Sequence, residues 1–151
     1  MGIARMKKVE LGCGMIYREI PDGGFEFYLG QRRKEDPHSY RRWSFFCGRR
    51  ELSDPSIFAT ARRETREEAG IYNIRMDGVV GVYETPELPN LVKTVIVVGS
   101  YDGEPRAVPA EFFEGRWFTS GHIDELSDDR LTFGTREAIR DFLRKRGYEQ
   151  D

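Results

Sequence analysis

The sequence predicts an α/β fold, a sandwich in which helices cover a mixed β-sheet. Two observations support this. Segments with strand character lie before, between and after two helical segments, and each helical segment gathers its apolar residues on one stripe. At 151 residues and 38% hydrophobic, the chain is long enough to bury one core. No linker, internal repeat or low-complexity tract divides it, so we expect a single domain over residues 1–151.

The first predicted elements are two strands that pair as a hairpin. Residues 11–19 are typical of a strand, and Gly12 and Gly14 leave room there for another backbone to come close. A Pro-Asp-Gly-Gly turn follows, and residues 25–30 then show the period of two that marks a half-buried strand. Residues 32–42 show no periodicity and predict a surface loop, after which residues 43–46 form a short apolar strand.

A helix is predicted from about Pro55 to about Ala69. Asp54 is a suitable N-cap, Pro55 suits the first helical position, and Gly70 suits the C-terminal stop. The stripe expected to face the sheet consists of Phe58, Ala61, Thr65 and Ala69.

The second half of the chain predicts three strands and one more helix. Residues 74–84 and 91–101 form two strands, separated by a loop that contains two prolines. Residues 115–118 resemble a last strand. The closing helix covers residues 135–146, because its apolar residues share one face and Gly147 follows as the stop.

Three acidic residues of the first helix fall on one side of it. Glu64, Glu67 and Glu68 share a narrow wedge, because spacings of three and four bring helical side chains together. Like charges this close repel, and a divalent cation would reverse that effect. Mg²⁺ or Mn²⁺ is the natural partner for clustered carboxylates that have no His or Cys beside them. The alternative is a solvated acidic face with Arg63 and Glu67 as an ordinary ion pair.

The stretch Arg63-Glu64-Thr65-Arg66-Glu67-Glu68-Ala69-Gly70-Ile71 resembles the second half of the Nudix box, with Thr65 at a position that is usually aliphatic. Gly48 resembles the glycine that opens the box. Asp54 stands where glutamate is usual, and eight residues instead of seven separate it from Arg63. These departures affect the outer ligands and the start of the helix.

The resemblance implies an α/β/α sandwich and Mg²⁺-dependent cleavage of a phosphoanhydride bond. It implies metal binding by Glu67 and Glu68, with Glu64 as a ligand or general base, Gly48 as a further metal-site residue, and Arg63 orienting the carboxylates. Nudix proteins place the base either on this helix or on a loop, so Glu84 and Glu87 remain alternatives to Glu64.

Several other segments resemble the asymmetrical dinucleoside tetraphosphate hydrolases, which split diadenosine tetraphosphate. The matching segments are residues 13–18, 25–29, Trp43, 63–71, 93–96, and Glu111 six residues before Trp117. The likeness implies that Glu111 is an extra metal ligand and that Lys93 reaches a phosphate. A lysine usual before the loop is missing, and Arg49 or Arg50 would replace it.

Residues 32–50 hold seven basic and two acidic residues, a local excess of positive charge that suits a polyphosphate. Stacking on a nucleobase would require an aromatic ring. The candidates are Tyr40, Trp43, Tyr83 and Phe112.

The composition excludes some other classes of protein. A formal net charge of −2 argues against general attraction to nucleic acid or an anionic membrane. No signal peptide or membrane span is present, and two cysteines without a metal-binding pattern predict reduced thiols in a cytoplasmic protein. Nucleoside triphosphate, nucleotide-sugar and RNA 5′-end hydrolysis remain alternatives, as does a non-catalytic nucleotide-binding module. The sequence does not indicate an oligomeric state.

Overall fold

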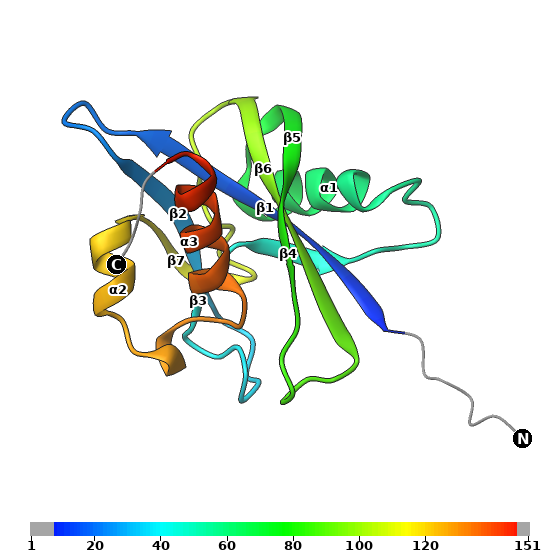
Figure 1. Cartoon of the computed structure of the whole chain (residues 1–151). Helices are drawn as coiled ribbons and strands as arrows, with labels where there is room; N and C mark the ends of the chain where they lie inside the picture. The colour runs from blue at the N-terminus through cyan, green and yellow to red at the C-terminus, as the bar shows by residue number, and fades with distance from the viewer. Residues whose placement is uncertain (1–7, 148–151) are drawn as a thin grey trace, which may run out of the picture.

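The computed structural model describes residues 8–147, so both ends of the predicted domain lie outside the described part of the chain. Strands come before and after the helix α1, and two further helices close the described chain (Figure 1). The elements are β1 (Val9–Glu19), β2 (Phe25–Arg32), β3 (Trp43–Ser44), β4 (Phe46–Arg49), α1 (Ile57–Ala69), β5 (Tyr72–Tyr83), β6 (Leu91–Asp102), β7 (Phe112–Thr119), α2 (Ser120–Glu125), a 3-10 turn (Asp128–Arg130) and α3 (Thr135–Lys145).

The strands form one mixed sheet around β1. The order is β3-β2-β1-β6-β5, while β4 pairs with β1 and β7 pairs with β2. β1 and β6 are parallel, and the other pairs are antiparallel. The predicted hairpin is confirmed, because residues 16–19 of β1 pair with residues 25–28 of β2.

Helices cover both faces of this sheet, so the predicted α/β/α sandwich is confirmed. One apolar core packs α1 against the sheet and is centred on Ile16, Phe46 and Ile96. The other core packs α2 and α3 against the opposite face, through side chains such as Ile123 and Phe142. Figure 1 shows α1 well separated from α2 and α3.

The register of the central strands assigns different residues to the two faces. Gly12 of β1 pairs with Gly48 of β4, and both backbones lie against α1, as the sequence predicted for Gly12. Leu11 lies next to Arg49 on one side and next to Lys93 of β6 on the other. Because side chains alternate along a strand, these three residues share the face away from α1.

α1 begins at Ile57 instead of Pro55, and its N-cap is Ser56, whose Oγ accepts a hydrogen bond from the Ala59 N–H at 3.2 Å. The prediction that Asp54 caps the helix is therefore wrong. Its carboxylate accepts bonds from the preceding turn and from the Thr60 hydroxyl instead. The predicted stop is confirmed, because Gly70 has a left-handed backbone with φ 69°.

The two cysteines are not reduced thiols, because Cys13 and Cys47 form a disulfide. The antiparallel register of β1 and β4 sets them directly opposite each other on one face. The sequence prediction is wrong because 34 residues separate them and no local pattern marks the pairing. Cysteine usage therefore no longer supports a reducing compartment.

The C-terminal part contains a short helix, α2, that the sequence analysis missed, whereas the closing helix is confirmed as α3. α2 is six residues long and buries only Ile123, too little for a periodic apolar pattern. Among the described residues, no helix combines the length and apolar character needed to cross a membrane.

We predict that Gly12→Ala destabilises the fold by about 1–3 kcal/mol, because an added methyl group would overpack the interface between β1 and α1. A Cβ on Gly12 would lie 2.9 Å from the Ala61 backbone nitrogen and 3.0 Å from the Ile57 oxygen. Gly78→Ala is the matched control, since a Cβ there meets nothing within 4 Å. Urea unfolding compares the variants, and equal midpoints for both would contradict the close packing of α1.

Candidate functional site

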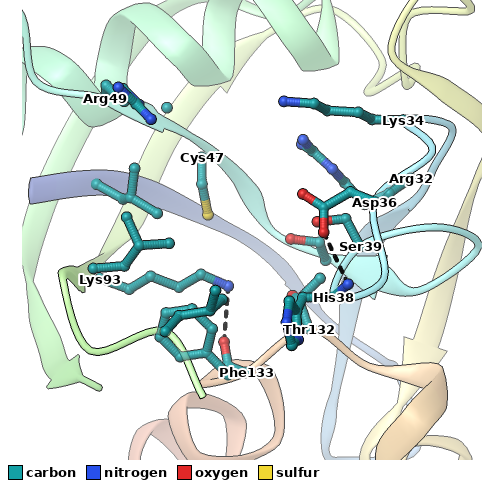
Figure 2. A pocket seen from close by; sticks show the side chains of 15 residues that line it. Arg32, Lys34, Asp36, His38, Ser39, Cys47, Arg49, Lys93, Thr132 and Phe133 are labelled. Atoms are coloured by element: carbon teal, nitrogen blue, oxygen red, sulfur yellow. Dashed lines mark hydrogen bonds between the residues drawn. The ribbon is translucent and has the colours of Figure 1, made fainter. Parts of the chain in front are cut away.

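A cleft of about 270 Å³ opens on the sheet face away from α1 (Figure 2). Its walls come from the loop after β2, the end of β4, the start of β6 and the segment before α3. Figure 2 shows Arg32 and Lys34 on one side of it, with Lys93 and Phe133 across from them. Four elements distant in sequence thus contribute to one site.

Positive charge dominates this cleft. Its basic residues are Arg32, Lys34, Arg49 and Lys93, and its acidic residue is Asp36. Asp36 accepts a hydrogen bond from the His38 backbone N–H at 2.9 Å and so helps to shape the loop. A cleft with this balance of charge suits a polyanion such as a polyphosphate.

Lys93 is the most deeply buried of the four cations. Its Nζ donates a hydrogen bond to the Phe133 carbonyl oxygen at 2.8 Å and lies 4.1 Å from the centroid of the Phe133 ring. Burial lowers the pKa of the Lys93 ammonium to about 7, because water is removed from the charged form. An anion in the cleft would favour the charged amine.

Glu68 of α1 carries a buried carboxylate beside the cleft residue Arg32. Glu68 Oε1 accepts from Arg32 Nη1 at 3.4 Å, a weak contact. Glu68 Oε2 is buried and has no hydrogen-bond partner within residues 8–147. Burial, and to a lesser extent the carboxylates of Glu64 and Glu111, raise the pKa of Glu68 to about 9. Such a group is stable as an anion only when a cation reaches its free oxygen.

Glu64 lies one helical turn before Glu68, directly against Gly48. A Cβ on Gly48 would overlap the Glu64 carboxylate, so only glycine leaves room for that group. Burial raises the pKa of Glu64. The close approach of β4 to α1 therefore holds the Glu64 carboxylate in place, one helical turn from that of Glu68.

Arg63 links these acids to the preceding loop. Its guanidinium donates to Glu64 Oε1 at 2.7 Å, to Asp54 Oδ2 at 2.9 Å and to the Arg49 carbonyl at 3.2 Å. The hydrogen bond from Arg63 holds the pKa of Asp54 well below its usual range. Asp54, which departs from the Nudix pattern, thus positions Arg63.

Glu67 and Glu111 lie further out. The Glu67 side chain is 59% exposed and lies 3.8 Å from Arg63. Glu111 is also exposed, and its carboxylate lies close enough to Glu68 to raise the pKa of Glu68. In the described chain, no three acidic, His or Cys side chains are gathered around one metal position. Glu67 lies near Arg63 and is largely exposed, so among the helix acids only the half-buried Glu64 and the buried Glu68 lie close together away from solvent.

Three predicted substrate-binding residues lie outside the cleft. Arg50 is exposed and binds Glu10, while the Tyr83 hydroxyl donates to Asp141 Oδ2 at 2.7 Å on α3. Tyr40 lies on the cleft loop but packs against Phe113. The other two stacking candidates, Trp43 and Phe112, belong to the buried cores.

The cleft is also lined by three residues that no sequence motif marks as binding residues: Arg32, Thr132 and Phe133. Arg32 was one member of a basic run, and its contact with Glu68 spans 36 residues. Thr132 and Phe133 lie in a segment without a motif. Only the fold brings that segment to Lys93.

Comparisons with known proteins bear on this site. The family model of the NUDIX domain matches residues 15–142. Comparison with curated proteins gives no match.

Solved structures of similar fold cover most of the chain. The MutT NUDIX hydrolase from Burkholderia pseudomallei is 23% identical, with a TM-score of 0.69 over 90% of this chain and 98% of that chain. The E. coli ORF135 protein is 21% identical, with a TM-score of 0.71 over 93% and 92%. The NUDIX domain of Shewanella oneidensis NrtR, solved with ADP ribose, is 13% identical, with a TM-score of 0.73 over 94% and 90%.

We predict that Lys93→Met removes a pH dependence from folding stability. The pKa of Lys93 is about 7 when folded and about 10.4 in an unfolded chain, so the unfolded state binds more protons between these values. The free energy of unfolding of the wild type should therefore rise from pH 7 to 10 relative to the variant. Urea titrations at several pH values measure this difference. Lys34→Met is the control, because Lys34 lines the cleft but is exposed. Parallel curves of unfolding free energy against pH for the wild type and Lys93→Met would contradict the burial of the charge.

Proposed function

Because this chain belongs to the NUDIX family and is a Nudix-type pyrophosphohydrolase, we propose that it cleaves the phosphoanhydride bond of a nucleoside diphosphate linked to another group, with Mg²⁺ as cofactor. One observation carries the proposal. The buried Glu68 oxygen without a partner lies beside Glu64, next to Arg32 of a cationic cleft. A divalent cation and a polyphosphate together would satisfy both the carboxylates and the basic residues.

The residues present fit such a cation. Glu68 and Glu64 offer oxygen atoms without a nearby imidazole or thiolate, which favours Mg²⁺ or Mn²⁺ over softer metals. Glu67, Glu111 and the Gly48 backbone could complete the ligand set. When bound, the cation would neutralise phosphate oxygens and lower the pKa of a water molecule.

The protein's own side chains bind and orient the substrate. Four basic residues of the cleft bind phosphate oxygens and hold the scissile linkage in place. They are Arg32 and Lys34 on one wall and Arg49 and Lys93 on the other walls. Arg63 does not itself line the cleft; it donates to the backbone of Arg49 and acts by fixing the Glu64 carboxylate. Burial of Glu68 keeps water away from the charge, which strengthens its attraction for the cation.

The candidates for the general base are Glu64 on the helix and Glu84 and Glu87 on the loop. Glu64 is held by Arg63 at 2.7 Å, and Glu84 forms an ion pair with Lys8 at 2.5 Å. Glu87 lies 3.6 Å from His38, which lines the cleft.

A dinucleoside polyphosphate such as diadenosine tetraphosphate is the leading substrate within this class. The similar Shewanella NUDIX domain solved with ADP ribose supports the broader class, because ADP ribose is a nucleoside diphosphate linked to another group. Nucleoside triphosphates, nucleotide sugars and RNA 5′ ends are the alternatives. A substrate panel separates them by product, since diadenosine tetraphosphate yields AMP and ATP and a triphosphate yields pyrophosphate.

A non-catalytic nucleotide-binding module is the alternative outside the enzymes. Such a module would gain nothing from a buried carboxylate with one oxygen that has no partner among the described residues, because that group destabilises the metal-free protein. Nucleotide binding without turnover in Mg²⁺ or Mn²⁺ would favour it.

We predict that Glu68→Gln lowers Mg²⁺-dependent hydrolysis by about 100-fold or more, since one charge that holds the catalytic cation is lost. The same change should not lower the thermal stability of the metal-free protein, because a neutral amide replaces a buried carboxylate. Mg²⁺ should raise the melting temperature of the wild type and not that of the variant.

Glu125→Gln on the exposed side of α2 is the control for the loss of one acidic charge. It should keep both turnover and the stabilisation by Mg²⁺. Unchanged hydrolysis by Glu68→Gln, in a protein that unfolds like the wild type, would refute the assignment of the metal to this carboxylate.

A further inference from the structure

Outside the cleft, two aromatic rings lie exposed beside each other. Tyr40 and Phe113 have centroids 5.9 Å apart with their planes at 70°. Their exposed fractions are 40% and 39%, high for ring side chains. The Arg41 guanidinium lies 5.5 Å from the Tyr40 ring and 5.4 Å from the Phe113 ring, and Arg33 lies 5.0 Å from Phe113. These four residues are called the outer platform below.

One residue of the outer platform, Arg41, has a strained backbone conformation. Arg41 has φ 62°, a left-handed value that is uncommon for a residue other than glycine. Its N–H donates to the Arg32 carbonyl at 2.9 Å, and the Gln31 side chain donates to the Arg41 carbonyl at 3.2 Å. Such strain persists only where surrounding bonds enforce it and is common at binding sites. The backbone of Arg41 is therefore fixed by the fold, beside the two rings that its guanidinium approaches.

Three of the four platform residues, all but Phe113 of β7, lie on the same loop as one wall of the cleft. Ser39 and Arg32 line the cleft, whereas their sequence neighbours Tyr40 and Arg33 belong to the platform. The Arg33 N–H also donates to the Glu111 carbonyl at 3.0 Å. Arg32 and Glu111 both act on Glu68, so the platform begins one residue away from groups at the proposed catalytic centre.

The cleft is too small for two nucleosides. Its volume of about 270 Å³ lies just below the range of roughly 300–1,000 Å³ found for small-molecule sites. A substrate with one nucleoside in the cleft and its phosphates at Arg32 must place any second nucleoside outside. The loop that carries Arg32 offers the outer platform for it.

The chemistry of the outer platform matches a nucleotide. Tyr40 and Phe113 offer apolar ring surface on which a base stacks. Arg33 and Arg41 add guanidinium groups, which stack on bases and bind phosphates.

We propose that the outer platform binds the second nucleoside of a dinucleoside polyphosphate whose first nucleoside occupies the cleft. This inference rests on the proposed function and adds a second base-binding site to it. The platform explains how this chain would distinguish a dinucleoside polyphosphate from a nucleoside triphosphate, because only the former reaches both places.

Binding without turnover tests the proposal. Diadenosine tetraphosphate and ATP are titrated in EDTA by calorimetry into the wild type and into the double variant Tyr40→Ala/Phe113→Ala. The wild type should bind diadenosine tetraphosphate about tenfold or more tighter than ATP, the gain of one stacked base. The double variant should keep its affinity for ATP and lose that advantage.

Two matched variants control for general effects. Tyr40→Phe/Phe113→Tyr retains both rings and should keep the advantage, and Tyr72→Ala removes an exposed ring on β5 and should change neither affinity. Equal affinities of wild type and double variant for diadenosine tetraphosphate would overturn the proposal. A wild type that binds diadenosine tetraphosphate and ATP equally would also overturn it. So would a double variant that, with a 5′-triphosphorylated RNA titrated as a third ligand, loses affinity for that RNA alone. A separate hydrolysis assay in Mg²⁺ tests the proposed function, so the two failures can be distinguished.

Discussion

The structure depends on the close contact between α1 and the paired strands β1 and β4. Gly12 and Gly48 make that contact possible, because neither carries a side chain that would hold the helix away from the sheet. Once the helix lies there, the residues on its sheet-facing side are buried whether they are apolar or not. Ala61 and Thr65 fit that environment, and Glu68 does not. The packing of the fold thus places a carboxylate where it is unstable without a cation.

Two arginines, Arg32 and Arg63, partly offset the cost of burying acidic groups at this position. On the cleft side, Arg32 reaches Glu68 only at 3.4 Å and leaves one oxygen free. On the loop side, Arg63 is held by Asp54 and holds Glu64, so the second carboxylate is already oriented. The protein keeps its acids in place and leaves their charge incompletely neutralised. That combination favours binding of a divalent cation, and the basic cleft beside it favours the phosphates of a substrate.

Local patterns predicted the sandwich, the hairpin and both long helices, because the burial of one face dictates periodicity. The N-cap was misplaced since Asp54 is drawn to Arg63, nine residues on, and Ser56 caps the helix instead. The disulfide and the outer platform could not be predicted, because each joins residues that are far apart in the sequence and that only the fold brings together. The acidic helix was visible in the sequence, but which of its glutamates is buried depends on how α1 packs. Of the cleft, the sequence indicated only the basic residues between positions 32 and 50. Its wall at Phe133 comes from a segment without a motif and could not be predicted.

The most direct test of this account is the location of a divalent ion in a crystal grown with Mn²⁺. We expect an anomalous-scattering peak bonded to Glu68, with Glu64 as a second ligand and the contact between Glu68 and Arg32 loosened. A peak elsewhere in the molecule, or none while the Glu68 oxygen still lies buried and unpaired, would contradict the claim that this carboxylate anchors the catalytic cation.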